Sequence, residues 1–296
     1  MHIGISSGLG RTVERASELG CEAIQIFASN PNAWRPGEFD TQSAETFRRL
    51  ADKLEIHPVA VHTPYLLNLA SPDPEIYDKS IAALSEAMRR ASLLGAAYVV
   101  THIGSHKGEG VEAGVSRVSN AVSKVLHRSE TPVVMLLENS AGAGNSVGST
   151  FEHLRAILDC LQEYEGRLGL CLDSAHLWGA GYPLSDQEEV ASTIEDFDAI
   201  VGLSWLKLLH LNDTNVELGS HRDRHANVGT GKIGEAGFEA ILNYPPLIPL
   251  AGIIETPGRP PEAEELDLDI LKRLRQKPHL FVPLPGGATG GRNTST

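Results

Sequence analysis

Residues 133–140 read VVMLLENS, an apolar run that ends in a glutamate, Glu138. Short apolar runs of this kind recur along the chain, separated by stretches with apolar residues three and four positions apart. The first pattern is typical of buried strands and the second of amphipathic helices. The predicted strands are His2–Ile5, Ala23–Phe27, Val59–His62, Tyr98–His102, Val133–Glu138, Leu168–Asp173, Leu206–Leu211 and Gly252–Glu255. The predicted helices are Arg11–Leu19, Glu45–Leu54, Pro74–Leu94, Gly114–Leu126, Phe151–Leu161, Glu188–Ile200, Ala236–Leu242 and Glu262–Leu274.

The alternation of strands and helices indicates the fold class. Strands that alternate with helices pair in parallel through right-handed crossovers. Eight such units in 296 residues predict an α/β protein with a closed (β/α)₈ TIM barrel rather than an open doubly wound sheet. We find no linker that would divide the chain, so we expect one domain over residues 1–284. Residues 285–296 are rich in Gly, Ser and Thr and are predicted to form a disordered tail.

Composition bounds the class of protein. The chain is 41% hydrophobic without a membrane-length apolar stretch, which predicts a soluble globular protein with no membrane partner. The first residues lack the pattern of a secretion signal, so we expect a cytoplasmic protein. Three cysteines without CxxC spacing indicate neither a disulfide framework nor a thiolate zinc site. A net charge of −13 argues against nucleic-acid binding by a broad basic surface, unless bound cations concentrate positive charge in one cleft.

The ends of the predicted strands carry side chains that bind metals. In a TIM barrel the catalytic groups lie where the strands run out into the following loops. Six consecutive strands end at or beside such a residue: His62, His102, Glu138, Asp173, His210 and Glu255. Two loops add His176 and, within HRDRHANVG, the pair Asp223 and His225. Strand ends converge in space although they are far apart in sequence, so these side chains are predicted to form one cluster.

This set of side chains points to a particular metal chemistry. Mixed imidazole and carboxylate ligands suit Zn²⁺, with Mn²⁺ or Fe²⁺ as alternatives, whereas an all-oxygen set would suit Mg²⁺ or Ca²⁺. The ligands are too many for one ion. If one carboxylate bridges two ions, three ions can each have three or four protein ligands and keep open positions. Clustered metals of this kind are suited to phosphoryl chemistry.

Several runs of sequence resemble the endonuclease IV family of apurinic/apyrimidinic endonucleases, which have a xylose-isomerase-like TIM barrel. They are HTPYLLNLAS (62–71), HIGSH (102–106), LLENSAGAGNSVG (136–148), CLDSAHLWGAGY (171–182), HLNDT (210–214), DRHANVGTGKIG (223–234) and IIETP (253–257). The resemblance covers about residues 1–275. It implies three zinc ions, with Mn²⁺ as an alternative at one site, and double-stranded DNA as partner. We expect a monomer, because the barrel must open its face to a long duplex. The implied reaction is hydrolysis of the phosphodiester 5′ to an abasic site, leaving a 3′-hydroxyl and a 5′-deoxyribose phosphate, and trimming of blocked 3′ ends.

The resemblance also implies a role for each candidate ligand. His62, His102 and Glu138 would hold the first metal, and Glu138 would bridge to the second. Asp173, His210 and Glu255 would complete the second site. His176, Asp223 and His225 would hold the third. The implied catalytic residues are Glu255, which would assist the attacking water, and the bridging Glu138.

A further set of residues is expected to contact DNA. Tyr65 and Leu66 resemble family residues that push into the duplex beside the lesion, and Arg224 is expected to face the DNA as well. In FASNPNAWRPG (27–37), Asn32 stands where family members commonly carry an arginine. Asn32, Trp34 and Arg35 remain as the candidate contacts of this loop with sugar or phosphate.

Other interpretations stay open at this point. A sugar isomerase or epimerase of the related barrels also places His, Asp and Glu around divalent metals, but it needs fewer ligands. A non-catalytic metal-binding or DNA-damage-binding protein would close each structural zinc site with four protein ligands, whereas this set leaves open positions. Asp173 and His176 fit a helix N-cap and its first turn, and Asp223 and His225 fit a solvated charged loop. Asp213 is either a group that orients a ligand or a turn residue.

Overall fold

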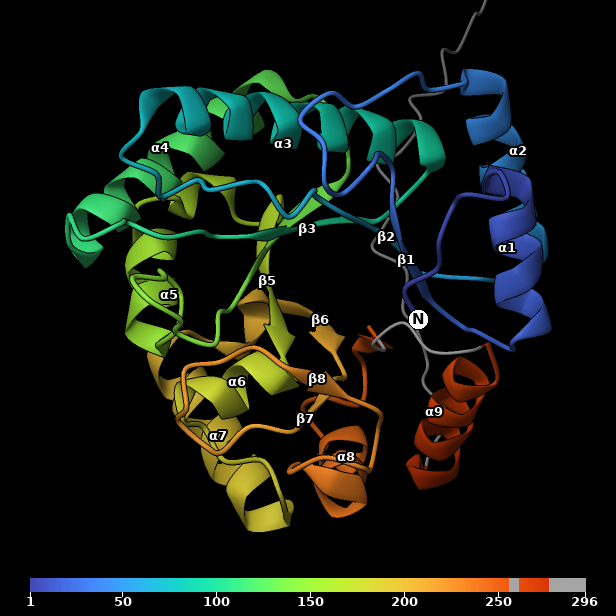
Figure 1. Cartoon of the computed structure of the whole chain (residues 1–296), viewed down its shortest axis with the longest axis vertical. Coiled ribbons are helices and arrows are strands. Elements are labelled where there is room, and N and C mark those ends of the chain that lie inside the picture. Colours follow the sequence, from blue (N-terminus) through green and yellow to red (C-terminus); the bar gives the residue numbers. More distant parts are fainter. Residues whose placement is uncertain (256–260, 277–296) are drawn as a thin grey trace, which may run out of the picture.

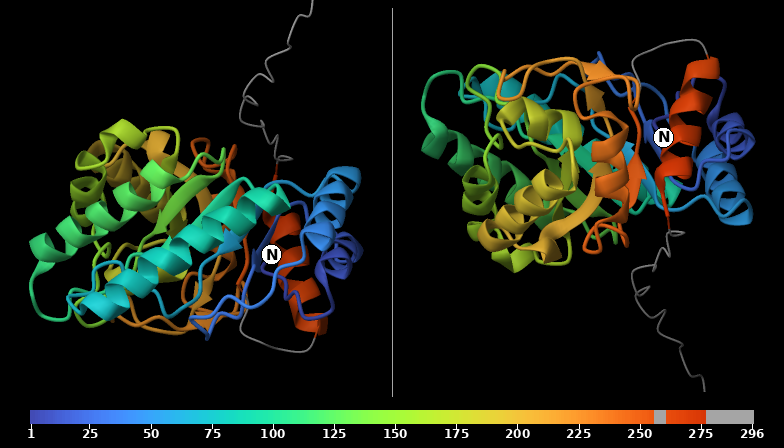
Figure 2. Two further views of the ribbon diagram at one scale, coloured as in Figure 1. Left: turned by 90° about the horizontal axis from the view of Figure 1, so that it is seen from above. Right: turned by 90° about the horizontal axis from the view of Figure 1, so that it is seen from below.

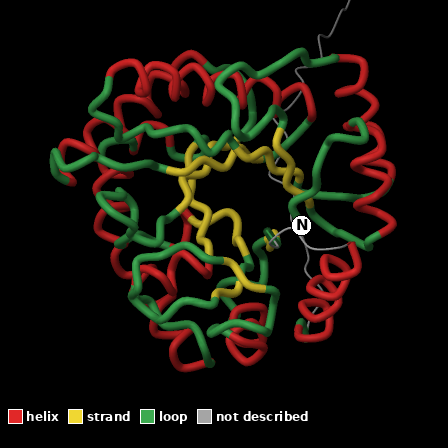
Figure 3. Tube along the Cα trace, in the orientation of Figure 1, coloured by secondary structure: helices red, strands yellow, loops and turns green. Residues whose placement is uncertain are grey.

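Parallel strands form a ring at the centre of the molecule. The structure, a computed structural model, describes residues 1–255 and 261–276. Within them, seven strands pair in parallel in the order β1-β2-β3-β4-β5-β6-β9. They are β1 (Ile24–Phe27), β2 (Val59–His62), β3 (Tyr98–His102), β4 (Val134–Glu138), β5 (Leu168–Asp173), β6 (Leu206–His210) and β9 (Ala251–Ile253). Figure 3 shows these strands in yellow, encircled by the helices in red.

The surrounding helices follow one another around the ring in chain order (Figure 1). They are α1 (Leu9–Glu18), α2 (Thr41–Lys53), α3 (Pro74–Leu94), α4 (Val111–Arg128), α5 (Phe151–Asp159), α7 (Gln187–Ile200), α8 (Gly234–Asn243) and α9 (Pro261–Leu274). Two 3₁₀ turns, η1 (Gln162–Tyr164) and η2 (Leu203–Trp205), precede β5 and β6. The predicted (β/α)₈ barrel class is therefore confirmed. Among the described residues, no helix combines the length and apolar character needed to cross a membrane.

The prediction of a four-residue strand at the start of the chain is wrong. Of His2–Ile5, only His2 forms a β-bridge, with Gln25. The backbone nevertheless closes the ring, because His2 N donates to Ile254 O (2.8 Å) and Ile3 N donates to Gln25 O (2.8 Å). Figure 2 shows α9 beside α1 at this closure, and Arg275 after α9 makes a bidentate ion pair with Glu22 before β1. The boundary at residue 284 and the tail predicted at 285–296 lie outside the described residues.

Local sequence explains where the helices begin and end. Asp40 accepts hydrogen bonds from Gln42 N and Ser43 N, so α2 begins at Thr41, four residues before the predicted start. Asp73 caps α3 in the same way, and Pro74 occupies its first turn. Gly95 ends α3 with φ 69°, a conformation that favours glycine. The predicted bounds of α3 are therefore confirmed.

Side chains alternate between the two faces of each strand, and this alternation positions the site. One face packs against the helices in the main core. The other lines the barrel interior, where residues of the strands and Ala23, directly before β1, form a second cluster: Ala23, Ala60, Tyr98, Val100, Val134, Leu136, Cys171, Leu208 and Ile253. Two positions beyond Ala60, Val100, Leu136, Cys171, Leu208 and Ile253 lie His62, His102, Glu138, Asp173, His210 and Glu255. The candidate ligands therefore sit on the inward face, at the carboxyl ends of the strands.

Three short elements lie near the site, and of these the sequence suggested only a helix start at Asp173, as one of two interpretations. Helix α6 (Ser174–Ala180) begins directly after β5, and β7 (Asp213–Thr214) pairs antiparallel with β8 (His225–Ala226). Each is too short to show a hydrophobic period in the sequence. Together they carry His176 and His225 toward the strand ends.

Candidate metal centre

The structure brings all nine predicted ligands together. His62, His102, Glu138, Asp173 and His210 are the last residues of β2 to β6, whereas Glu255 lies two residues beyond the end of β9. Ligand atoms of eight of the nine form three groups, each with its atoms within 4.8 Å of one another. Asp223, the ninth, contacts two members of the third group.

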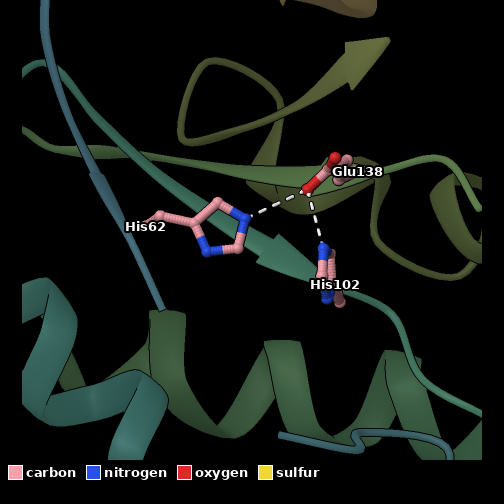
Figure 4. Close-up of side chains that lie close together, drawn as sticks. All are labelled: His62, His102 and Glu138. Atoms are coloured by element: carbon pink, nitrogen blue, oxygen red, sulfur yellow. Dashed lines mark hydrogen bonds and ion pairs between the residues drawn. The ribbon is translucent and has the colours of Figure 1, made fainter. Parts of the chain in front are cut away.

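The first group comprises His62, His102 and Glu138 (Figure 4). The Nε2 atoms of His62 and His102 lie 3.1 Å and 3.3 Å from the same oxygen, Glu138 Oε2. His62 Nδ1 lies 2.7 Å from Thr63 O and donates to it, which leaves Nε2 as the nitrogen that faces the group. His62 and Glu138 are buried, while the His102 side chain is 37% exposed and opens the group to solvent.

The second group shares Glu138 with the first and adds Asp173, His210 and Glu255. His210 Nδ1 lies 3.1 Å from Glu138 Oε1, 3.2 Å from Glu255 Oε2 and 3.7 Å from Asp173 Oδ2. Glu138 thus turns one oxygen to each group. This is the arrangement required of a carboxylate that bridges two ions.

The third group comprises Asp173, His176 and His225, with Asp223 beside them. Asp223 Oδ2 lies 3.3 Å from His176 Nε2, and Asp223 Oδ1 lies 3.1 Å from His225 Nε2. Asp173 also caps α6, because its Oδ1 accepts from His176 N (2.8 Å). The N-cap interpretation of Asp173 and the ligand interpretation are therefore compatible. The Asp223 side chain is 51% exposed and faces the mouth of the site.

Neighbouring opposite charges strongly shift the pKa values of these side chains. Burial would raise the pKa of Glu138, but charged His210 and His102 beside it hold that pKa well below its usual value. Burial opposes ionisation of Glu255 too, and His210 and His2 hold its pKa well below the usual value. Burial disfavours the charged form of His225, yet its contact with Asp223 raises the pKa to about 9. Glu138 and Glu255 therefore remain ionised acceptors at neutral pH.

The donor set fits divalent cations. Buried carboxylates and imidazoles require a partner for their charge and lone pairs. His225 Nε2 is buried and has no aligned hydrogen-bond partner, although Asp223 Oδ1 is at ion-pair distance. This atom also lies 3.9 Å from Asp173 Oδ2 and is available to a metal ion. Mixed nitrogen and oxygen donors of this kind suit Zn²⁺.

Buried amides hold the ligands in place, and they were not predicted from the sequence. Asn212 Nδ2 donates to Asp173 Oδ2 (2.6 Å) and to Glu255 Oε2 (3.3 Å), while its Oδ1 accepts from Glu255 N (2.8 Å). Asn139 Oδ1 accepts from Asp173 N (2.7 Å), and His176 Nδ1 donates to the main-chain carbonyl of Asn139 (2.9 Å). In the sequence, only their proximity to predicted ligands could have indicated this role: Asn139 follows Glu138, and Asn212 lies two residues after His210. Amides of this kind fix the orientation and tautomer of metal ligands.

Asp213 proves to organise the backbone rather than to orient a ligand. Its carboxylate accepts hydrogen bonds from the N–H groups of Thr214, Gly231, Ile233 and Gly234. The side chain is fully buried. Asp213 therefore anchors both ends of the segment that carries Asp223 and His225.

Of the candidate DNA contacts, Tyr65 and Leu66 line a groove beside the ligands. Tyr65 and Leu66 are exposed large hydrophobic side chains, 54% and 36% exposed. The Tyr65 ring stacks on His102 with centroids 6.1 Å apart. A groove of about 430 Å³ runs from these residues past Glu138 and His176. Asn32, Arg35 and Arg224 are exposed, whereas Trp34 is half-buried against the core.

Known proteins share this fold and much of this sequence. Residues 13–276 match the family described as xylose isomerase-like TIM barrel. A protein of Natranaerobius thermophilus named "Probable endonuclease 4" is 44% identical over 275 residues, covering 92% of this chain and 96% of its own length. One of the same name from Methanoculleus marisnigri is 45% identical, with 86% and 91% covered.

Solved structures agree with this assignment. Endonuclease IV from Thermus thermophilus superposes with a TM-score of 0.82 at 35% identity, covering 93% of this chain and 97% of that one. A D-tagatose 3-epimerase-like protein also superposes, with a TM-score of 0.69, but its 21% identity establishes the shared fold alone. The chain therefore belongs to the endonuclease IV family of xylose isomerase-like TIM barrels.

Proposed function

We propose that this protein is a DNA-repair endonuclease that hydrolyses the phosphodiester 5′ to abasic sites. The products are a 3′-hydroxyl and a 5′-deoxyribose phosphate, and the same site removes blocking groups from 3′ ends. One observation carries the proposal: three adjacent ligand groups, two of them sharing Glu138, open beside the exposed Tyr65. Membership in a family whose relatives are named endonuclease 4 supports it.

Three zinc ions are the proposed cofactors, with Mn²⁺ as an alternative at one position. His62, His102 and Glu138 would hold the first ion. Glu138, Asp173, His210 and Glu255 would hold the second. His176, Asp223 and His225 would hold the third, and Asp173 lies close enough to contribute. When bound, zinc ions supply Lewis acidity toward phosphate oxygens and lower the pKa of water.

The protein's own side chains orient the reaction. Gln25 Nε2 donates a hydrogen bond to Glu255 Oε1, so Oε2 is the oxygen that faces His210 and the rest of the second group. With its pKa held low, this carboxylate is an ionised acceptor for a proton of the attacking water. Glu138 acts by holding the first two groups at a fixed separation.

DNA recognition falls to the rim of the site. Tyr65 and Leu66 are proposed to insert beside the lesion, because extruding a sugar without a base forfeits little stacking. Asn32, Trp34, Arg35 and Arg224 are proposed to contact sugars and phosphates. Three divalent ions would offset about half of the −13 charge, and they would do so within the cleft where phosphate must bind.

Incision of a duplex carrying one tetrahydrofuran abasic analogue tests the proposal. The analogue cannot undergo β-elimination, so any cut is hydrolytic. We expect cutting 5′ to the analogue by the purified protein, loss after prolonged chelation, and recovery with zinc. Glu255→Gln should lower the rate by orders of magnitude. Glu235→Gln, a matched change at an exposed residue of α8, should not.

Two outcomes would redirect the assignment. Failure to cut by protein shown to hold three metals would turn attention to sugar isomerisation or epimerisation, assayed next on ketose substrates. Near-full incision by Glu255→Gln would remove Glu255 from the mechanism. A duplex with a nick blocked by a 3′-phosphoglycolate tests the 3′-trimming activity separately.

A further inference from the structure

Strand β1 places one uncharged polar side chain inside the barrel, close to the metal centre. Ile24 and Ile26 pack outward in the main core, whereas Gln25 lies between them on the inward face and is fully buried. A buried amide must find hydrogen-bond partners for both its ends. Gln25 finds them among the side chains of the second ligand group.

The contacts determine how the amide is oriented. Gln25 Nε2 lies 2.7 Å from Glu255 Oε1 and 3.1 Å from His2 Nδ1, and Gln25 Oε1 lies 3.0 Å from His210 Nε2. An ionised carboxylate can only accept, so Nε2 must be the atom that faces Glu255. Gln25 Oε1 then faces His210, and His210 Nε2 must carry the hydrogen that it donates.

This hydrogen bond decides which nitrogen of His210 is available. With the hydrogen on Nε2, the lone pair of neutral His210 is on Nδ1. Nδ1 is the nitrogen that lies 3.1 Å from Glu138 Oε1 and 3.2 Å from Glu255 Oε2. The same amide engages Glu255 Oε1, so Oε2 is left to face the group. One glutamine thus directs two ligand atoms, at the ends of two different strands, toward one point.

We infer that Gln25 is a positioning residue that selects His210 Nδ1 and Glu255 Oε2 as the metal-binding atoms of the second group. The inference rests on the proposed function only in taking that group to hold zinc. Hydrogen-bond partners that orient metal ligands are typically worth about 10- to 100-fold in metal affinity. Gln25 contacts two ligands at once, so its removal should weaken one ion of the three by that factor.

The test measures zinc binding and the His210 tautomer in the full-length protein, without DNA. Gln25→Met keeps the length of the side chain and removes its hydrogen bonds to His210, Glu255 and His2. Zinc titration against a chromophoric chelator should show one ion per chain bound about 10- to 100-fold more weakly. ¹⁵N NMR of the His210 ring in zinc-loaded protein should show metal bound at Nδ1 and hydrogen on Nε2 in the wild type, and Gln25→Met should lose this single state.

A second variant and a control separate positioning from a general loss of stability. Gln25→Glu retains an acceptor for His210 Nε2–H but replaces the donor to Glu255, so zinc affinity should fall while the His210 tautomer is kept. Thr193→Val, on α7 and away from the ligands, removes a buried hydrogen bond to Pro183 O and should change neither readout.

The inference is overturned if Gln25→Met matches Thr193→Val in zinc affinity and in tautomer. If Gln25→Met does not fold, an unchanged zinc affinity in Gln25→Glu overturns it. Failure of the proposed function looks different, because wild-type protein that binds three zinc ions but leaves abasic DNA intact would contradict the endonuclease assignment and leave the role of Gln25 standing.

Discussion

Replacing Asp213 with asparagine should loosen the segment that supports the third ligand group. Asp213 Oδ1 accepts from Thr214 N (2.8 Å) and Ile233 N (3.1 Å), and Oδ2 accepts from Gly231 N (2.8 Å) and Gly234 N (3.4 Å). Asparagine keeps one acceptor oxygen and turns an NH₂ group toward the other two donors. Rotating the asparagine amide by half a turn does not restore these bonds, because each oxygen of Asp213 accepts from two N–H groups.

The magnitude follows from the number of donors left unsatisfied. A buried donor without a partner costs about 1–3 kcal/mol. Two N–H donors lose their acceptor. If the NH₂ group replaces Oδ2, these donors are Gly231 N and Gly234 N, and the hydrogen bond from Gly234 N is already long at 3.4 Å. We therefore expect Asp213→Asn to lower the free energy of unfolding by about 2–4 kcal/mol. The third ion, held from the same segment, should bind more weakly.

Urea unfolding of metal-free protein measures the first effect, and zinc content measures the second. The matched control is Asp186→Asn, at the exposed N-cap of α7, where Oδ1 accepts from Glu189 N (2.9 Å). Asparagine and aspartate are equally good N-caps, so the control should change stability by less than about 0.5 kcal/mol. Equal stability of the two variants would refute the anchoring role of Asp213.

Three further predictions concern the cluster, its mouth and a supporting ion pair. Glu138→Gln should reduce zinc content by at least one ion per chain, because its two oxygens serve different groups; three tightly bound ions in this variant would contradict the bridge. Tyr65→Ala should weaken binding of the abasic duplex by the loss of about 1–3 kcal/mol of stacking, with zinc content unchanged, and Tyr65→Phe should restore it; equal binding by the alanine variant and the wild type would argue against insertion. The hydrogen bond from Arg89, against the effect of burial, lowers the pKa of Glu86 from 4.5 to about 2. That depressed pKa stabilises the fold above pH 4.5 and ceases to do so as the pH falls toward 2, so the difference in unfolding free energy between wild type and Glu86→Gln should narrow below pH 4.5; a difference that stays constant down to pH 3 would contradict it.

The fold was predictable because barrel strands leave a clear trace in sequence. Apolar runs such as Val134–Glu138 are buried on both faces, so they stand out from the amphipathic helices between them. The first strand was the exception. His2 forms one bridge and the chain then leaves the barrel, turning at Gly8 with φ 94° into α1. Short apolar stretches at a chain end do not reveal how far pairing extends.

The candidate metal ligands were predictable for a related reason. The amide side chains that hydrogen-bond to them were not. A charged residue that ends an apolar strand, such as Glu138, needs a partner for its charge, and the barrel supplies the convergence. Gln25 gives no such signal, since one polar residue between two isoleucines also describes an ordinary half-exposed strand. Asn212 likewise resembles a loop residue. Their roles depend on contacts between strands far apart in the chain, which no spacing in one sequence encodes.

Incision of the abasic duplex as a function of zinc bound per chain is the decisive measurement for a three-ion nuclease site. Metal-free protein would be loaded with one to four equivalents of zinc, and zinc content and incision rate would be measured on the same samples. If each of the three ligand groups holds one ion, full activity requires the third equivalent of zinc, and a fourth equivalent adds nothing. Full incision with a single bound ion, or no incision with three, would show that the three groups do not act together as a nuclease site.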